Sequence, residues 1–152
     1  MEPIGIEVVQ PTEAVICPSS MISIVDDDRI VREAMGDLVQ SLGYEVATFE
    51  SAEHFLESGS LAETRCLITD VQMPGLDGLE LQRRLLAEGH PTPVIFVSAY
   101  SGGGSRKRAM DAGAVGFLSK PFHEDSLIKS VESALNASTN YATRKLVHRA
   151  SR

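Results

Sequence analysis

The strongest constraint on the fold of this chain is a regular alternation between short apolar runs and longer amphipathic segments. The run Ile22–Val25 is rich in β-branched residues, and between Ile30 and Leu42 apolar residues recur at the spacing of one helix face. The same two patterns return repeatedly as far as Leu135. Strands that are apolar throughout are covered on both faces, as in parallel sheets between two helix layers. The sequence therefore predicts an α/β fold with a doubly wound parallel sheet.

Five strands and five helices are expected from these patterns, and local signals indicate where helices begin and end. The expected strands are residues 22–25, 44–49, 66–70, 93–98 and 115–118, and the expected helices are residues 30–42, 51–56, 79–88, 105–112 and 124–135. Asp28 and Ser51 are expected to cap helix N-termini, because their side-chain oxygens accept hydrogen bonds from free backbone N–H groups. Gly43 is expected to end the first helix.

Length and composition indicate one domain and argue against several classes of protein. The 152 residues suffice for one core, assigned to residues 21–136, between an irregular extension (residues 1–20) and a basic tail or linker (residues 137–152). The net charge of −7 argues against direct nucleic-acid binding. The sequence shows no apolar run long enough to span a membrane and no secretory signal. Cys17 and Cys66 form no disulfide or zinc motif, so a cytoplasmic location is expected.

Polar side chains follow four of the five expected strands. They are Asp26, Asp27, Asp28, Asp70, Ser98 and Lys120. Because the carboxyl ends of parallel strands meet at one edge of the sheet, these side chains should lie close together. Crowded carboxylates repel one another unless a cation neutralises them, and Mg²⁺ binds one or two carboxylates while keeping several waters. Lys120 would add a compact positive charge for a phosphate oxygen.

This arrangement makes Asp70 a candidate nucleophile that forms an acyl phosphate. Pro74 and Gly75 would turn the chain sharply beyond Asp70, and the carbonyl of Gln72 could be a further metal ligand. Taken singly, several of these residues also have a purely structural interpretation. Asp28 fits a helix cap, and Ser98 fits a turn.

The motifs are similar to those of the receiver domain of bacterial two-component response regulators. They are ISIVDDD (22–28), LITDVQMPGLDGLEL (67–81), VIFVSAY (94–100), AGAVGFL (112–118) and SKPF (119–122). The resemblance covers residues 21–136 and is nearest to receivers of nitrogen-fixation regulators and to stand-alone receivers. It implies a flavodoxin-like (βα)5 fold with strand order 2-1-3-4-5.

The resemblance also implies roles for the acidic residues. Asp70 would be the phospho-acceptor. Asp27 would bind Mg²⁺ directly, with Mn²⁺ as a substitute, and Asp26 would act through water. Gln72 would offer its main-chain oxygen to the metal.

A second set of implied roles concerns the switch. Ser98 would turn towards the phosphoryl group, and Lys120 would contact its oxygens ahead of a cis bond to Pro121. Phe117 stands at the position of a switch aromatic, and it lacks the hydroxyl of the tyrosine common there. The loop at 99–108, which contains Gly102–Gly104, is either a loose surface turn or a segment that becomes ordered on phosphorylation, in which case Phe117 would pack inward beneath it.

The resemblance implies partners of several kinds. The phosphoryl donor would be a sensor histidine kinase or a histidine phosphotransfer protein, which would dock near Arg29, Arg32 and Glu33 of the first helix. A downstream effector would bind the face made by the fourth helix, fifth strand and fifth helix. A homodimer that forms on phosphorylation is compatible with the same family. The chain would be no enzyme beyond catalysing its own phosphorylation and dephosphorylation, and it would contact neither nucleic acid nor membrane.

Alternative functions remain open at this stage. A receiver fold that is never phosphorylated would be a constitutive interaction module. A hydrolase of the haloacid dehalogenase type needs a general acid two residues after its nucleophile, where this chain has Gln72. A flavin module needs hydrogen-bond donors after the first strand, where this chain has Asp26, Asp27 and Asp28. The segment after residue 136 is too short for an output domain, which fits a stand-alone receiver or a piece of a longer protein.

Overall fold

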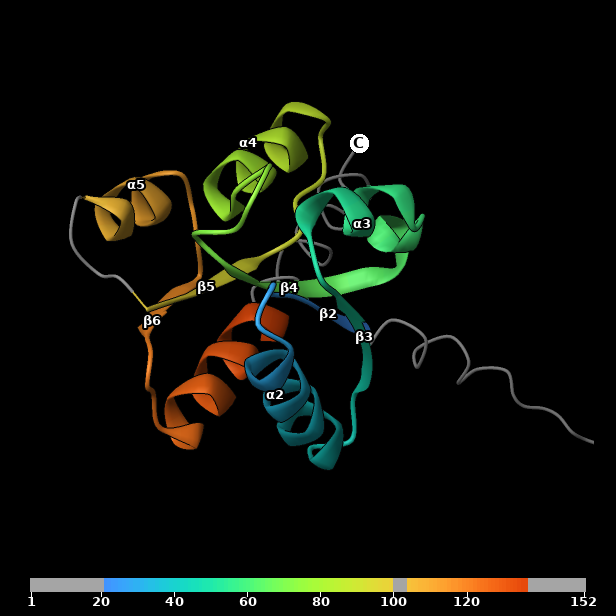
Figure 1. The fold of residues 1–152 in the computed structure, drawn as a ribbon, viewed down its shortest axis with the longest axis vertical. Helices are drawn as coiled ribbons and strands as arrows, with labels where there is room; N and C mark the ends of the chain where they lie inside the picture. The colour runs from blue at the N-terminus through green and yellow to red at the C-terminus, as the bar shows by residue number, and fades with distance from the viewer. Residues whose placement is uncertain (1–20, 100–103, 137–152) are drawn as a thin grey trace, which may run out of the picture.

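The computed structural model describes residues 21–99 and 104–136 of the chain (Figure 1). The strands are β2 (Met21–Val25), β3 (Glu45–Phe49), β4 (Thr64–Asp70), β5 (Val94–Ser98) and β6 (Gly116–Ser119). The helices are α2 (Arg29–Ser41), α3 (Ala52–Glu57), the 3-10 turn η2 (Ser60–Glu63), α4 (Gly78–Ala87), α5 (Ser105–Asp111) and a C-terminal helix over residues 124–136. Every expected strand and α-helix is therefore present. The extension at 1–20, the tail at 137–152, and Gly102 and Gly103 lie outside the described residues.

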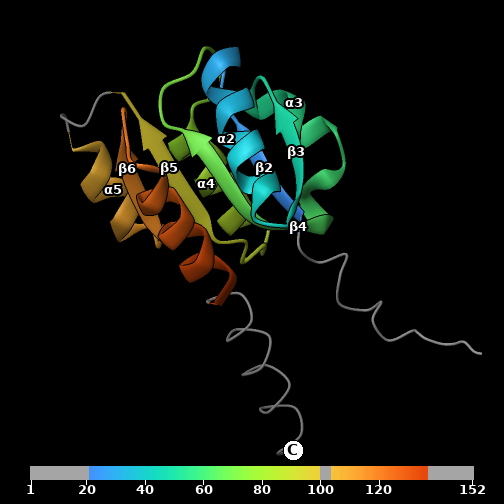
Figure 2. The ribbon, with the colours of Figure 1, turned by 90° about the horizontal axis from the view of Figure 1, so that it is seen from below.

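The five strands form one parallel sheet in the order β3-β2-β4-β5-β6. Numbered along the chain, this is the predicted order 2-1-3-4-5. Figures 1 and 2 show α3, α4 and α5 on one face of the sheet, and α2 with the C-terminal helix on the other. The doubly wound α/β architecture is thus confirmed. In the described residues, no helix is long and apolar enough to cross a membrane.

The core consists of two apolar layers, one on each face of the sheet. Successive side chains of a strand point to opposite faces, so Leu67 belongs to the layer under α3, α4 and α5, whereas Ile68 belongs to the layer under α2 and the C-terminal helix. Phe96 and Ile95 divide between the two layers in the same way. All four side chains are fully buried, and each such burial contributes about 1.5–3 kcal/mol.

Local sequence signals determine the ends of the helices. The Asp28 carboxylate accepts hydrogen bonds from the backbone N–H groups of Ile30 and Val31, and Ser51 accepts one from His54. Both predicted N-caps are confirmed. Gly43 follows α2 with a φ of 98°, a conformation that glycine adopts without steric cost.

The strand register determines which residues meet at the carboxyl edge of the sheet. Val25 pairs with Thr69, so Asp26, the next residue, lies level with Asp70. Ser98 pairs with Ser119, which directly precedes Lys120. The register therefore brings four separate segments of the chain to one edge.

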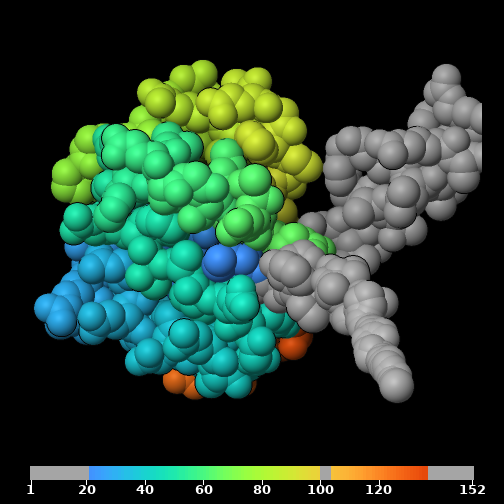
Figure 3. All heavy atoms as spheres, turned by 90° about the vertical axis from the view of Figure 1, so that its right-hand side faces the viewer, coloured from blue at the N-terminus to red at the C-terminus, as the bar shows by residue number. Residues whose placement is uncertain are grey.

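Figure 3 views the molecule from the β3 side, where residues of α2, β3 and α3 cover most of the surface.

Candidate functional site

Three carboxylates lie together at the carboxyl ends of β2 and β4. One carboxylate oxygen from each of Asp26, Asp27 and Asp70 lies within 4.8 Å of the others, and we call these three residues the acidic cluster. Asp26 and Asp70 are buried, whereas Asp27 is exposed. The ammonium of Lys120, whose side chain is 16% exposed, lies 3.0 Å from Asp26 Oδ2 and 2.9 Å from Asp70 Oδ2. Lys120 therefore bridges two of the three acids.

Asp26 is held through all four of its polar atoms. Its backbone N–H donates to the carbonyl of Phe49 at 3.1 Å, and its carboxylate accepts from the Asp28 N–H at 2.8 Å and from Lys120. Its carbonyl oxygen accepts from Arg32 Nη1 at 2.7 Å. Burial raises the pKa of Asp26, although the hydrogen bonds from Asp28 and Lys120 oppose that shift. Burial thus disfavours the charged form of Asp26, and the hydrogen bonds from Asp28 and Lys120 favour it.

The contacts of Lys120 with the acidic cluster favour its charged form. Burial by itself would lower the pKa of Lys120, but its hydrogen bonds and charge contacts with Asp70 and Asp26 outweigh burial and raise that pKa. The backbone N–H of Lys120 also donates to the carbonyl of Ser98 at 2.8 Å, which fixes the start of this segment to the end of β5. Lys120 precedes a cis peptide bond to Pro121, as the resemblance implied.

The charge balance of the site fits a divalent cation. Three carboxylates and the Lys120 ammonium leave a local charge of about −2 when all four are ionised, and the Arg32 guanidinium at the Asp26 carbonyl reduces it to about −1. Clustered carboxylate oxygens, one of them open to solvent, are the hard ligands that Mg²⁺ prefers. The donor set therefore fits the metal that the sequence predicts.

The loop after Asp70 is held in place from two sides. The Gln72 N–H donates to Asp70 Oδ1 at 3.1 Å, which orients the carboxylate. Glu53 of α3 accepts from the N–H of Leu76 at 2.8 Å. Gly78, the first residue of α4, packs so closely that a Cβ there would lie 2.1 Å from the Asp70 carbonyl oxygen. The acceptor strand and α4 therefore touch backbone to backbone.

Ser98 and Phe117, the predicted switch residues, both lie inside the protein. Ser98 is 1% exposed and Phe117 is 5% exposed, with its ring 6.2 Å from that of Phe96. The guanidinium of Arg106 lies 5.6 Å from the centre of the Phe117 ring, and Arg106 Nη1 donates to the Phe117 carbonyl at 3.2 Å. The Phe117 ring therefore packs inward in this structure, and its movement on phosphorylation stays a prediction.

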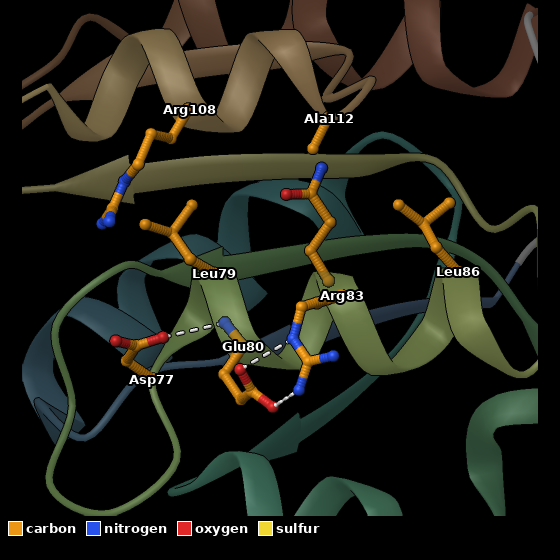
Figure 4. A pocket seen from close by; sticks show the side chains of 8 residues that line it. Asp77, Leu79, Glu80, Arg83, Leu86, Arg108 and Ala112 are labelled. Atoms are coloured by element: carbon orange, nitrogen blue, oxygen red, sulfur yellow. Dashed lines mark hydrogen bonds and ion pairs between the residues drawn. The ribbon is translucent and has the colours of Figure 1, made fainter.

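A separate groove of about 330 Å³ runs between α4 and α5, away from the acidic cluster. Figure 4 shows that Asp77 accepts from the Glu80 N–H and that Glu80 pairs with Arg83, while Gln82 donates to the Ala109 carbonyl of α5. The exposed Leu86 lines its far end. Nothing in this groove gathers groups for chemistry.

Three residues of the site were not found, or were misplaced, by sequence reasoning. Glu53 and Arg106 act through backbone atoms of distant segments, and no local pattern indicates such contacts. Arg32 had been expected on the outward docking surface, yet it is half-buried and turned towards Asp26. The signal available for Arg32 was its position one turn after the Asp28 cap, which places it beside the residues that enter the helix.

The sequence of this chain is similar to those of known response regulators. The family profile of the response regulator receiver domain matches residues 22–132. The response regulator protein TmoT of Ectopseudomonas mendocina is 42% identical over 116 residues, which are 76% of this chain and 53% of TmoT. The transcriptional regulatory protein FixJ of Bradyrhizobium diazoefficiens is 38% identical over 114 residues, which are 75% of this chain and 56% of FixJ.

Solved structures agree with these sequence matches. The response regulator StyR superposes with a TM-score of 0.78 at 37% identity, covering 85% of this chain and 65% of StyR. The structure named FixJ-N superposes with a TM-score of 0.69 at 33% identity, covering 76% of this chain and 93% of that one. The chain spans about half the length of the curated relatives that it matches.

Proposed function

The chain belongs to the response regulator receiver domain family, and from this premise we propose that Asp70 accepts a phosphoryl group in a magnesium-dependent reaction. The acyl phosphate would then change the conformation of the domain and so control a partner or an output domain. The observation that carries the proposal is the position of Asp70, at the end of β4 between Lys120 and the acidic cluster.

In the proposed reaction a carboxylate oxygen of Asp70 attacks phosphorus, and the bond from phosphorus to the donor breaks with its electron pair leaving on the donor. Gln72 N–H and Lys120 each hold one carboxylate oxygen, so the nucleophile is oriented before the phosphoryl group arrives. The Lys120 ammonium can pass from Asp70 to a phosphoryl oxygen as charge develops there. The same residues would serve when water hydrolyses the acyl phosphate, so the chain would catalyse only its own phosphorylation and dephosphorylation.

Asp26, Asp27, Asp70 and the Gln72 carbonyl are the groups proposed to hold Mg²⁺, with Mn²⁺ as a substitute. When bound, the metal would neutralise the charge of the transferring phosphoryl group. The exposed carboxylate of Asp27 gives it direct access, whereas the buried carboxylate of Asp26 is already occupied by Asp28 and Lys120. This difference supports direct binding by Asp27 and indirect help from Asp26.

The donor is proposed to be a phosphohistidine on a sensor histidine kinase or a phosphotransfer protein. A groove of about 290 Å³ lies between α2 and the C-terminal helix, and it is lined mainly by apolar side chains. Ile30, which lines this groove, is 79% exposed and extends its apolar surface outward. Arg29 and Glu33 pair with each other on the exposed surface of α2 and would border the docking site.

The output surface is proposed to be the face formed by α5, β6 and the C-terminal helix. Ser98 lies at the end of β5, which pairs directly with β6. It would move towards a phosphoryl group on Asp70. Because Phe117 is already buried under Arg106, the change on this face would come from α5 and its contact with β6. An effector, an attached output domain or a second copy of the chain would recognise the altered face.

Incubation with acetyl phosphate and Mg²⁺, followed by intact mass, tests the proposal. A gain of one phosphoryl group is expected in the native protein and in Asp77→Asn, a matched acid that only caps α4. The gain should be absent in Asp70→Asn, in Asp27→Ala and in excess chelator. A phosphorylated Asp70→Asn protein, or a native protein that gains no mass, would contradict it.

The alternative function is a constitutive interaction module that is never phosphorylated. The inward position of Phe117 in this structure is the observation that favours it, because the switch aromatic already occupies a buried site. The two functions differ in a simple measurement. An interaction module would keep full activity in a complementation assay with Asp70→Asn, whereas a phosphorylated receiver would lose its response to the signal.

A further inference from the structure

Arg32 makes a contact that its position on an amphipathic helix does not suggest. Its Nη1 donates to the carbonyl oxygen of Asp26 at 2.7 Å, across six residues of chain. Its own backbone N–H donates to the carbonyl of Asp28, the cap of α2. The side chain of Arg32 therefore holds Asp26, while its backbone N–H makes the ordinary helical bond to Asp28.

The turn that Arg32 holds carries the exposed ligand of the acidic cluster. Asp27 lies between Asp26 and Asp28, and within the described residues no side chain binds its carboxylate. The position of Asp27 therefore depends on how firmly its two neighbours are held. Outer groups that orient metal ligands in this way commonly change metal affinity by about 10- to 100-fold when they are removed.

We infer that Arg32 is a positioning residue for the divalent cation of the acidic cluster, acting through the Asp26 carbonyl. The inference rests on the proposed magnesium site. Arg32 donates through its terminal Nη1, which lies one bond farther from the backbone than a lysine ammonium, so a lysine here should not reproduce this contact. Arg32 thus acts on the phosphorylation site, whereas Arg29 and Glu33 on the exposed surface of α2 are the residues proposed to border the docking site.

The positive charge of Arg32 should weaken Mg²⁺ binding, whereas its positioning role should strengthen it. The two effects can therefore be separated by substitution. A guanidinium near three carboxylates weakens cation binding by simple repulsion. If charge were its only effect, Arg32→Met would tighten Mg²⁺ binding and Arg32→Lys would leave it unchanged. If Arg32 positions the turn, both variants should bind Mg²⁺ more weakly.

The experiment measures Mg²⁺ binding by titration calorimetry and, in parallel, the Mg²⁺ dependence of phosphorylation by acetyl phosphate. Arg32→Met and Arg32→Lys should raise the Kd for Mg²⁺ about tenfold or more. The Mg²⁺ concentration for half-maximal rate should rise equally, while the rate at saturating Mg²⁺ recovers towards the native rate. A merely destabilised protein would instead lose amplitude with an unchanged half-saturation point.

The matched control is Arg29→Met, one turn earlier on α2, because Arg29 pairs only with Glu33 on the exposed surface in the described structure. It should leave the Kd for Mg²⁺ unchanged. Native-like or tighter Mg²⁺ binding in both Arg32 variants would overturn the role of Arg32 and leave the magnesium site intact. A native protein that binds no Mg²⁺ would overturn both proposals.

Discussion

Replacing Gly78 by alanine should damage the acceptor strand more than its small size suggests. A Cβ on Gly78 would lie 2.1 Å from the Asp70 carbonyl oxygen, 3.1 Å from the Asp70 carbonyl carbon and 3.2 Å from a ring carbon of Phe96. Carbon–oxygen contacts in proteins settle at about 3.3 Å or more, so this contact must open by roughly 1.2 Å. The first atoms met belong to backbone, which cannot rotate away as a flexible side chain would.

The expected cost follows from this geometry. Overpacking a well-packed site costs about 1–3 kcal/mol, and a clash between two backbones should reach the upper end, about 3 kcal/mol. The shift must also move Asp70 or pull Gly78 away from its hydrogen bond to the Val71 carbonyl. We therefore expect Gly78→Ala to slow phosphorylation in the molecules that remain folded, because the nucleophile is displaced from Lys120.

Gly36→Ala is the matched control, with the opposite expected sign. A Cβ on Gly36, in the interior of α2, would meet Thr48 at 3.6 Å and Val46 at 3.7 Å, which are ordinary contacts. Alanine is better than glycine in a helix interior by about 0.8–1.0 kcal/mol, so this variant should be more stable than the native protein.

Urea unfolding followed by far-UV circular dichroism measures both changes in the free energy of unfolding. Gly78→Ala should lose about 3 kcal/mol, equivalent to a fall in Tm of roughly 10 °C for a domain of this size. A loss below about 1 kcal/mol, with native phosphorylation, would refute the inference that α4 and Asp70 meet backbone to backbone.

Three further changes test the electrostatics and the switch. Asp26→Asn should raise the free energy of unfolding at pH 7, because burial raises the pKa of Asp26 and so disfavours the charged form in the folded protein. This gain should vanish as the pH falls to 3.8, the ordinary pKa of an aspartate, where the carboxyl group is protonated in both states. Urea unfolding at a series of pH values measures the change. Lys120→Ala should still accept a phosphoryl group from acetyl phosphate, more slowly than the native protein, but should show no change in hydrogen exchange over α5, and a normal change would exclude Lys120 from the switch. Arg106→Ala should cost about 1 kcal/mol and increase hydrogen exchange in α5, whereas Lys107→Ala, whose ion pair with Asp111 is exposed, should do neither.

Much of the fold follows from local patterns in the chain. The apolar period determines five strand–helix pairs, and caps such as Asp28 and Ser51 act on backbone groups only a few residues away. These interactions are short in sequence, so they can be predicted without knowing where the rest of the chain lies. Boundaries were less accurate, because β4 begins at Thr64, where a buried hydroxyl pair with Ser23 extends the strand beyond its apolar run.

The candidate site was predictable in composition but not in its contacts. The sequence shows that acids and a lysine follow the strands, and parallel strands must end at one edge. The contacts of Lys120 with Asp26 and Asp70, in contrast, depend on the register across three strand pairs and on the rotamer of one side chain.

What the sequence alone determined about this protein is its alternating architecture and the identity of the residues at the carboxyl edge. Only the tertiary structure decided that Arg32 turns inward to the Asp26 carbonyl, that Phe117 is buried beneath Arg106, and that Gly78 leaves no room for a methyl group beside Asp70. The physical reason is the range of the interactions. Periodicity and capping act within one or two turns of chain, whereas side-chain direction and close packing are selected by neighbours that folding brings from distant segments.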